Sequence, residues 1–306
     1  MKTICAIMFF CAITQIESLA QNKINEKYLG ETPPSLTAKE FGKNIISNDS
    51  IYVFGSAFST MADEFYYAVR IDEKWNAELW QTKYKNGKWT EPKRVNFNKN
   101  FSYNDPFLSK DQRRLYFMSN YTLGGDKPSD KSDLWYSRRI GESWSTPINL
   151  GEPINTDKNE FYISLTENNT LYFSSNRNSS DKNQSDYDLF FAKYKNGKYQ
   201  EPIQMGPEIN SEYFDVDPFI APDESYLIFS SSRPGGKGKG DLYISFKTTN
   251  NKWTKAINMG DQINTEKHEF CPFVSHDGKY LFFTRNGKIY WISSKIIDNL
   301  KKNVIN

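Results

Sequence analysis

Histidine and cysteine are scarce in this chain of 306 residues, which holds two histidines and three cysteines. His268 and His276 lie on either side of one short apolar segment, so several histidine ligands cannot converge on a zinc ion. The chain also lacks the G-x-S-x-G turn that carries the nucleophile of many serine hydrolases. These absences exclude multi-histidine zinc chemistry and that type of hydrolysis, and we expect no cofactor.

The chain also has no large excess of one charge and no long hydrophobic run. The 39 Lys and Arg residues nearly balance the 37 Asp and Glu residues, which leaves a formal net charge of +2. A balance of this kind does not indicate a polyanionic partner, so we do not expect nucleic-acid binding. No apolar segment approaches the roughly 20 residues that a membrane-spanning helix needs.

The N-terminus has the pattern of a secretory signal peptide. Lys2 precedes a mostly apolar stretch from Ile4 to Ile13, and Ser18-Leu19-Ala20 supplies small residues before Gln21. We therefore predict a signal peptide over residues 1–20 and a mature chain over residues 21–306, exported to the periplasm or secreted. Cys271 is then the one cysteine that stays, and its apolar surroundings predict a buried, inert thiol.

The most informative feature is a repeat. The phrase KYKNGKW ends at Trp89, and related phrases end at Trp144, Tyr199 and Trp253, in steps of 55, 55 and 54 residues. A fixed period of this size indicates structural units that must stack on one another to bury their apolar faces. Aromatic residues make up 16 % of the chain, which favours strands over helices.

Each unit is predicted to hold four strands. A short apolar strand leads through a tight turn to a Leu-x-Phe strand, then to an Asp-Leu-aromatic strand, and finally to the strand that carries the Trp or Tyr. A degenerate copy around Phe58 and Glu64–Tyr67 raises the count to five units. Four antiparallel strands in each of several repeats describe the blades of a β-propeller, so we predict an all-β, five-bladed propeller over residues 21–306.

The last unit is incomplete, because the chain turns helical after its third strand, Ile289–Ile292. The N-terminal sequence Tyr28-Leu29-Gly30-Glu31 mirrors the end of another unit, Asn149–Glu152. We therefore predict that the segment Lys23–Leu29 supplies the missing strand and closes the ring. Six blades are the alternative, if Phe41–Phe54 forms more than a linker.

These repeats resemble those of the TolB-like, WD40-like β-propeller family. That family has Ser-Pro-Asp-Gly at the turn, then Leu-x-Phe, Ser-x-Arg and Asp-Ile-Tyr; here the pattern reads Ala221-Pro222-Asp223-Glu224 with Leu227, Phe229, Arg233 and Asp241-Leu242-Tyr243. The resemblance covers nearly all of the mature chain. It implies an exported or periplasmic propeller that binds other proteins or envelope polymers. TolB itself has a separate N-terminal α/β domain, which this sequence lacks.

One face of the predicted ring collects charged residues, because the loops that enter strand one and those that join strands two and three lie at the same end. The candidate binding residues are Asp105, Asp133, Glu160, Arg177, Asp188, Asp217, Arg233, Lys237, Lys239, Asp241 and Arg285. Their recurrence from blade to blade favours an architectural role, in which the Arg and the Asp of one blade hold the loop between strands two and three. The Gly-rich loop Pro234–Gly240 is predicted to be mobile, with anion wrapping as the alternative.

Two functions remain open from the sequence. The first is a non-enzymatic binding or scaffold propeller that recognises a protein or an envelope polymer through the loops at Asn120, Asn176 and Gly235. The second is a glycoside hydrolase-like enzyme that uses the strand-one carboxylates Asp105, Glu160 or Asp217, which two-carboxylate chemistry would allow if a pair of them faced one pocket. A calcium site on the same three carboxylates is a weaker alternative, since no dense acidic loop accompanies them.

Overall fold

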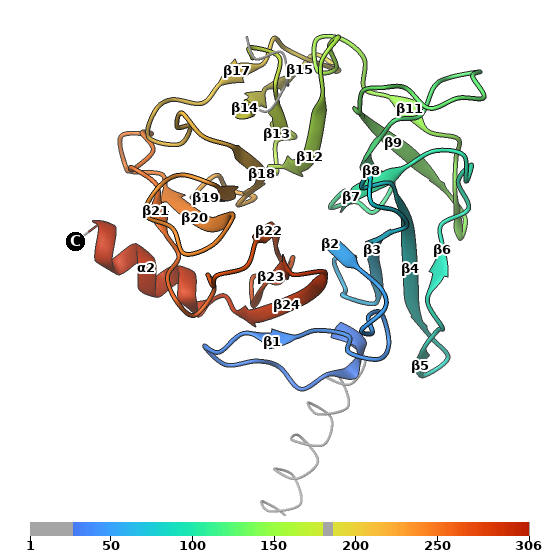
Figure 1. Ribbon diagram of the computed structural model, residues 1–306, viewed down its shortest axis with the longest axis horizontal. Helices are drawn as coiled ribbons and strands as arrows, with labels where there is room; N and C mark the ends of the chain where they lie inside the picture. Colours follow the sequence, from blue (N-terminus) through green and yellow to red (C-terminus); the bar gives the residue numbers. More distant parts are fainter. Residues whose placement is uncertain (1–26, 180–185, 306) are drawn as a thin grey trace, which may run out of the picture.

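Five antiparallel sheets stand around a central axis and form a closed five-bladed β-propeller (Figure 1). This computed structural model describes residues 27–179 and 186–305. The predicted signal peptide, Cys5, Cys11 and residues 23–26 lie outside the described residues. The prediction of an all-β, five-bladed propeller is confirmed, and the six-bladed alternative is wrong.

Blades one and two follow the chain from the axis outward. Blade one consists of β2 (Val53–Phe58), β3 (Glu64–Arg70), β4 (Ala77–Lys85), β5 (Lys88–Trp89) and β6 (Lys93–Arg94). Blade two consists of β7 (Tyr103–Leu108), β8 (Arg114–Ser119), β9 (Asp133–Ile140), β10 (Ser143–Trp144) and β11 (Ile148–Asn149).

Blades three to five repeat this order. Blade three consists of β12 (Glu160–Leu165), β13 (Leu171–Ser175), β14 (Asp188–Ala192) and β17 (Ile203–Gln204), with a small hairpin of β15 (Tyr194–Lys195) and β16 (Lys198–Tyr199). Blade four consists of β18 (Asp215–Ile220), β19 (Tyr226–Ser231), β20 (Asp241–Phe246) and β21 (Ile257–Asn258). Blade five consists of β22 (Glu269–Val274), β23 (Tyr280–Arg285), β24 (Lys288–Ser293) and β1 (Lys39–Glu40).

Local sequence explains the tight turns. Asn86-Gly87 joins β4 to β5, and Asn196-Gly197 joins β15 to β16, with positive φ at all four residues. Such angles define the primed turns that match the twist of paired strands, and Asn-Gly adopts them with little strain. Asn286-Gly287 makes the same turn between β23 and β24, so blade five has a minimal loop between its second and third strands.

The N-terminal part of the chain closes the ring, but not through the predicted residues. Lys39 pairs with Trp291 and Glu40 with Tyr290, so β1 is the outer strand of blade five. Tyr28 and Leu29, which were predicted to form that strand, lie instead in η1 (Tyr28–Gly30) and are buried in the adjoining core. The likeness of Leu29-Gly30 to Leu150-Gly151 predicted the wrong segment because both are turns with positive φ at Gly, not strands.

The chain ends in the helix α2 (Lys295–Ile305), which follows β24 directly. Ile296 and Ile297 at its start are buried against the aromatic core that joins blades five and one. Within the described residues, no helix has the length and apolar character to cross a membrane.

The innermost strand of every blade contains an irregularity at the same place. The pairing with the second strand shifts register near its third residue in all five blades. That residue has φ between 50° and 65° and is, in blade order, Gly55, Asp105, Tyr162, Asp217 and Cys271. A bulge of this kind changes the direction of a side chain, and these five positions form one ring around the channel.

Neighbouring blades are joined by aromatic contacts, of which Trp144 is an example. Its ring lies 5.9 Å from that of Tyr66 in blade one, and the Arg139 guanidinium lies 4.5 Å from its centroid. The indole is half-buried. We expect Trp144→Ala to lower the free energy of unfolding by about 2–3 kcal/mol, at the lower edge of the range for buried aromatics.

Urea unfolding of the two proteins measures this loss. Met61→Ala, at a side chain that is 60 % exposed, is the control and should change stability by less than about 0.5 kcal/mol. A loss below about 1 kcal/mol for Trp144→Ala would mean that its ring does not join the blades.

Candidate functional site

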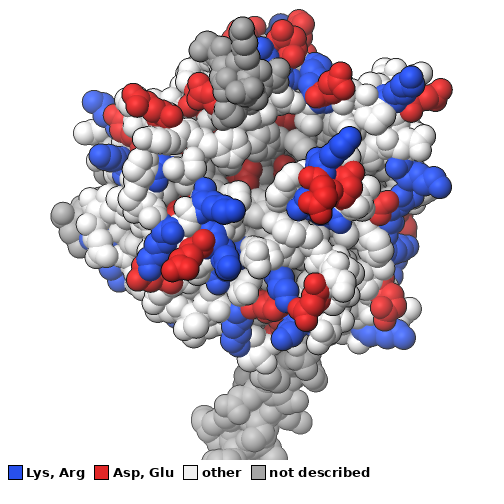
Figure 2. Space-filling view, viewed as in Figure 1, with Lys and Arg blue, Asp and Glu red and all other residues white. Residues whose placement is uncertain are grey.

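All five blades contribute to one pocket at the mouth of the central channel. Its volume is about 420 Å³. It lies at the ends of the innermost strands, on the face where the loops between second and third strands gather. Its lining consists of Phe54, Trp75, Asn104, Asp105, Met118, Ser132, Asn159, Phe161, Tyr187, Phe214, Val216, Asp217, His268, Phe270 and Cys271. Figure 2 shows one face of the ring hollowed near its middle, with acidic side chains visible inside the hollow.

Three bulge residues form the floor of this pocket. Asp217 Oδ2 accepts the backbone N–H of Cys271 at 3.0 Å, and the Cys271 thiol lies 3.6 Å from Asp105 Oδ1. Below them Tyr162 reaches from blade three to blade five, where its hydroxyl donates to the carbonyl of Pro272 at 2.7 Å. The floor is therefore a fixed polar cluster at a depth where little water enters.

Burial controls the protonation of this floor. It raises the pKa of Asp105 well above its usual range, and the charge of Asp217 raises it further. Burial also raises the pKa of Asp217, to about 6, although the Cys271 N–H opposes the shift. The pKa of the Cys271 thiol is raised by burial and by both carboxylates, so the thiol stays protonated. Because the two carboxyls interact, they titrate as a pair, and the pKa of each is raised.

Aromatic side chains form two opposite walls. On one side the Phe270 ring lies 6.2 Å from Phe54, 6.3 Å from Trp75 and 4.7 Å from His268. On the other side Tyr187 lies 4.9 Å from Phe161 and 5.3 Å from Phe214. Trp75 is 44 % exposed at the rim, where the guanidinium of Arg70 covers one face of its ring at 4.5 Å. The pocket therefore combines an acidic floor with apolar walls.

Glu160 does not belong to this site, although the sequence grouped it with Asp105 and Asp217. It is the first residue of β12, two positions before the bulge, and its true equivalents are Asp215 and Glu269. The error arose because Phe161-Tyr162 was matched to Pro218-Phe219, whereas the bulges align Tyr162 with Asp217. The predicted trio of catalytic carboxylates is thus reduced to two.

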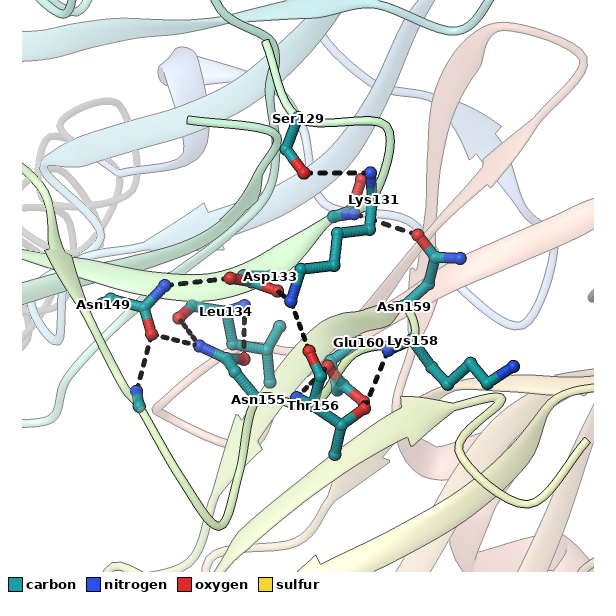
Figure 3. A network of polar contacts seen from close by, with 12 residues as sticks. Ser129, Lys131, Asp133, Leu134, Asn149, Asn155, Thr156, Lys158, Asn159 and Glu160 are labelled. Carbon is teal, nitrogen blue, oxygen red and sulfur yellow. Dashed lines mark hydrogen bonds and ion pairs between the residues drawn. The ribbon is translucent and has the colours of Figure 1, made fainter. Parts of the chain in front are cut away.

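Glu160 is part of a clasp between blades two and three (Figure 3). Asn155 clamps the backbone of Leu134 in blade two, accepting its N–H at 2.8 Å and donating to its carbonyl at 2.9 Å. The next residue, Thr156, donates its backbone N–H and its hydroxyl to Glu160 in blade three. Asn210-Ser211 with Asp215, and Asn264-Thr265 with Glu269, repeat these bonds at the next two junctions.

Each clasp is completed by an arginine of the same blade. Arg177 pairs with Glu160, Arg233 with Asp215 and Arg285 with Glu269, at 3.4, 2.7 and 2.8 Å. In each of these blades the acid that pairs with the arginine is the first residue of the innermost strand. All three carboxylates are fully buried, so the guanidinium neutralises a charge that has no access to water.

The other predicted residues lie around the pocket rather than in it. Asp133 pairs with Lys131 at 3.3 Å, and Asp188 accepts a hydrogen bond from Gln204 at 2.6 Å. Asp241 accepts the backbone N–H groups of Lys237 and Gly238. The Lys239 N–H donates to the carbonyl of Lys267 in blade five, so the Gly-rich loop already uses three of its amides within the fold.

Sequence reasoning found the two aspartates of the floor and missed the walls. Trp75, Tyr187, Phe214 and His268 all come from loops, where aromatic residues carried no repeated signal. Phe54, Phe161 and Phe270 share one position, directly before the bulge in the innermost strand. An alignment of the repeats on the bulge would have shown that position to be aromatic in three of five blades.

A metal site is not formed by these groups. Among residues 27–179 and 186–305, no cluster of three or more His, Cys, Asp or Glu side chains has the geometry to hold a metal ion. Asp105, Asp217 and Cys271 of the floor are close together but are not arranged as metal ligands.

The fold defines the class of this protein as a five-bladed β-propeller, as the resemblance to TolB-like and WD40-like repeats predicted. No family model matches the chain, and no curated protein matches its sequence. Solved structures do match. A protein of unknown function from Dyadobacter fermentans is 14 % identical, with 86 % of this chain and 84 % of that chain covered and a TM-score of 0.52.

Two other solved structures also match. A putative TolB from Agrobacterium tumefaciens is 14 % identical over 78 % of this chain and 72 % of that chain, with a TM-score of 0.49. A puromycin-hydrolyzing peptidase from Mycobacterium tuberculosis is 11 % identical over 75 % of this chain, with a TM-score of 0.43. This chain spans 34 % of the length of that peptidase. At such identities the likeness concerns the fold.

Proposed function

We propose that this protein is an exported, non-enzymatic binding propeller whose loop-rich face recognises another protein. The observation that carries the proposal is a pocket at the centre of that face to which all five blades contribute. Rigid scaffolds present binding residues on loops, and concave, mostly apolar sites with a few polar groups are the usual form of a recognition site. Export rests on the signal-peptide pattern of residues 1–20.

The structure offers less to the glycoside hydrolase-like alternative. Of its three proposed carboxylates, Glu160 is held by Arg177, Thr156 and Ser175 in a buried clasp. Asp105 and Asp217 do line one pocket beside aromatic rings, which is the arrangement that this alternative requires. Its test is hydrolysis of a panel of aryl glycosides, with activity that disappears in both Asp105→Asn and Asp217→Asn.

Binding is tested by capture of partners from envelope and secreted fractions on the immobilised mature chain. Trp75→Ala and Phe214→Ala remove one aromatic from each wall, and we expect the partner to be lost from both variants. Met61→Ala and Ile140→Ala are matched controls, because both are exposed apolar side chains at the opposite end of the blades, Met61 in the turn after β2 and Ile140 at the end of β9. Capture that survives in the wall variants and fails in the controls would place recognition on the opposite face, and a captured polysaccharide would identify an envelope polymer as the partner.

A further inference from the structure

The buried carboxylates among the described residues fall into three groups. Glu160, Asp215 and Glu269 have fully buried side chains, and each has an arginine as counter-ion. Asp241 forms no ion pair but accepts the backbone N–H groups of Lys237 and Gly238 and the side-chain amide of Asn258. Asp105 and Asp217 are 7 % and 5 % exposed and form no ion pair with any Lys or Arg among the described residues. Among the described residues, the Asp105 carboxyl accepts a hydrogen bond from the weakly polar Cys271 thiol and from no cationic side chain. The fold supplies a cation for every clasp and none for the floor of the pocket.

The groups around this pair add no positive charge at neutral pH. The Cys271 thiol and the Tyr162 hydroxyl are uncharged, since burial raises the pKa of each. At the rim, burial and the charge of Lys239 lower the pKa of His268, so its imidazole is neutral. Arg70 is engaged with Trp75 and with Glu73 outside the floor. The negative charge of the ionised pair is thus left without a counter-ion at the base of an apolar pocket.

This combination has a chemical complement. A buried anion without a partner is costly, and a ligand that brings the missing cation removes that cost. Aromatic walls favour a cation on an apolar stem, because the stem contacts the rings and the ring faces attract the charge. An ammonium group has three N–H donors, enough to contact both carboxyls of the floor at once.

We propose that the channel-mouth pocket binds the side chain of a lysine of the partner protein, with its ammonium group between Asp105 and Asp217 and its methylene stem between the two aromatic walls. This inference rests on the proposed binding function and specifies what the partner presents. The Cys271 N–H fixes the Asp217 carboxylate, and the bulge conformation fixes the direction of both aspartates, so the acceptors are in place before the ligand arrives.

The direct probe is n-butylammonium, which has the head and the stem of a lysine side chain. We expect it to shift the NMR signals of the Cys271 amide and the Trp75 indole N–H of the full mature chain in a saturable manner. The neutral isostere n-butanol should bind at least about tenfold more weakly, because it lacks the charge-assisted hydrogen bonds. Equal binding of the two probes would overturn the proposal, and preference for n-butylguanidinium would replace lysine by arginine.

Two variants locate the charge. Asp217→Asn keeps an oxygen for the Cys271 N–H and removes the negative charge, so it should abolish the preference for the amine. Asp188→Asn is the matched control: Asp188 lies on the same face outside this pocket, and its pKa is also raised to about 6, chiefly by burial. Loss of the amine preference in both variants, or in neither, would contradict the assignment of the charge to the floor.

The pH dependence follows from the same groups. Binding of a cation requires the ionised pair, so affinity should fall as the pH drops through about 6 and Asp217 takes up a proton. Protonation of His268 at lower pH acts in the same direction. Between pH 7.5 and pH 5 we expect roughly a tenfold loss of affinity for the amine and no change for n-butanol. The Asp188→Asn variant should retain this loss.

Asp105→Asn tests whether the buried Asp105 carboxyl lowers the stability of the folded protein. The folded-state pKa of Asp105 lies above its unfolded value, so unfolding releases a proton between the two values and stability falls as the pH rises. The variant should therefore have a higher Tm than the parent at pH 7.5, and the difference should vanish near pH 3. A lower Tm at pH 7.5 would show that the carboxyl stabilises the fold instead.

Failure of this inference and failure of the proposed function give different results. If the wall variants lose the partner while butylammonium binds no better than butanol, the protein is a binding propeller and the lysine assignment is wrong. If the amine binds as described but the wall variants still capture the partner, the floor binds cations as proposed and the partner is recognised at another surface.

Discussion

Arg233→Met is expected to lower the free energy of unfolding by about 3 kcal/mol, because it leaves the Asp215 carboxylate buried without its counter-ion. The carboxylate side chain is fully buried and lies 2.7 Å from Arg233 Nη2. The guanidinium also donates to the carbonyl of Ile209, the residue that precedes the Asn210-Ser211 clasp. The guanidinium also lies over the rings of Phe229 and Tyr243, at 5.2 and 4.9 Å. Met replaces the apolar stem, so the loss reports on the charge and its contacts rather than on a large cavity.

Two further variants separate these contributions in urea unfolding. Adding Asp215→Asn to Arg233→Met removes the unpaired charge and should restore a large part of the loss. Arg94→Met is the matched control at a more exposed pair, since Arg94 and Glu78 are 32 % and 24 % exposed, and it should cost less than about 1 kcal/mol. If Arg233→Met costs no more than Arg94→Met, the clasps do not hold the blades together.

Phe41→Ala is expected to cost about 4 kcal/mol and to loosen the closure of the ring. Phe41 follows β1 directly and is fully buried. Its ring lies 5.1 Å from Phe282 and 5.2 Å from Trp291 in blade five, and 5.4 Å from Phe65 in blade one. Its backbone N–H donates to the carbonyl of Ile289. One side chain therefore joins the N-terminal segment to both blades at the seam.

Hydrogen exchange distinguishes a loosened seam from a general loss of stability. In Phe41→Ala the amide at position 41 should exchange much faster than amides in the middle of blade three. Phe190→Ala is the control, because Phe190 is as deeply buried but stacks on Phe173 within blade three. It should reduce stability by a similar amount while leaving the seam protected. Equal acceleration at the seam in both variants would mean that Phe41 has no special role in closure.

The repeat made the architecture predictable, and the exceptions have physical causes. Strand pairing follows from apolar alternation and from Asn-Gly turns, and both are visible in one sequence. The closing strand could not be predicted in this way. The strand β1 is only two residues long, and its position depends on the burial of Phe41 rather than on a repeated motif. Tyr28 and Leu29 resembled the end of a blade and instead fill the core beneath the seam.

The site was predictable in part for a similar reason. Asp105 and Asp217 stand before Pro-Phe in their strands, so their equivalence is plain from the sequence. Glu160 was grouped with them because blade three has Tyr162-Ile163 at that point instead of Asp-Pro. The clasp gives the correct alignment, since an Asn-Thr or Asn-Ser pair precedes each of Glu160, Asp215 and Glu269 by the same spacing. The aromatic residues that loops contribute to the walls recur with no fixed period, so only the folded structure shows that they lie together.

The clasps are distributed unevenly around the ring. They join blades two to three, three to four and four to five, whereas Val53 and Tyr103 stand where blades one and two would carry the acid. Blade one thus has no clasp at either junction and is joined to blade two by other contacts, among them the Arg139–Glu64 ion pair. It also carries Phe54 and Trp75 of the pocket wall. A ligand held between that wall and the one formed by Phe161, Tyr187 and Phe214 would connect blade one to the clasped blades three and four, so binding of the ligand would also stabilise the ring.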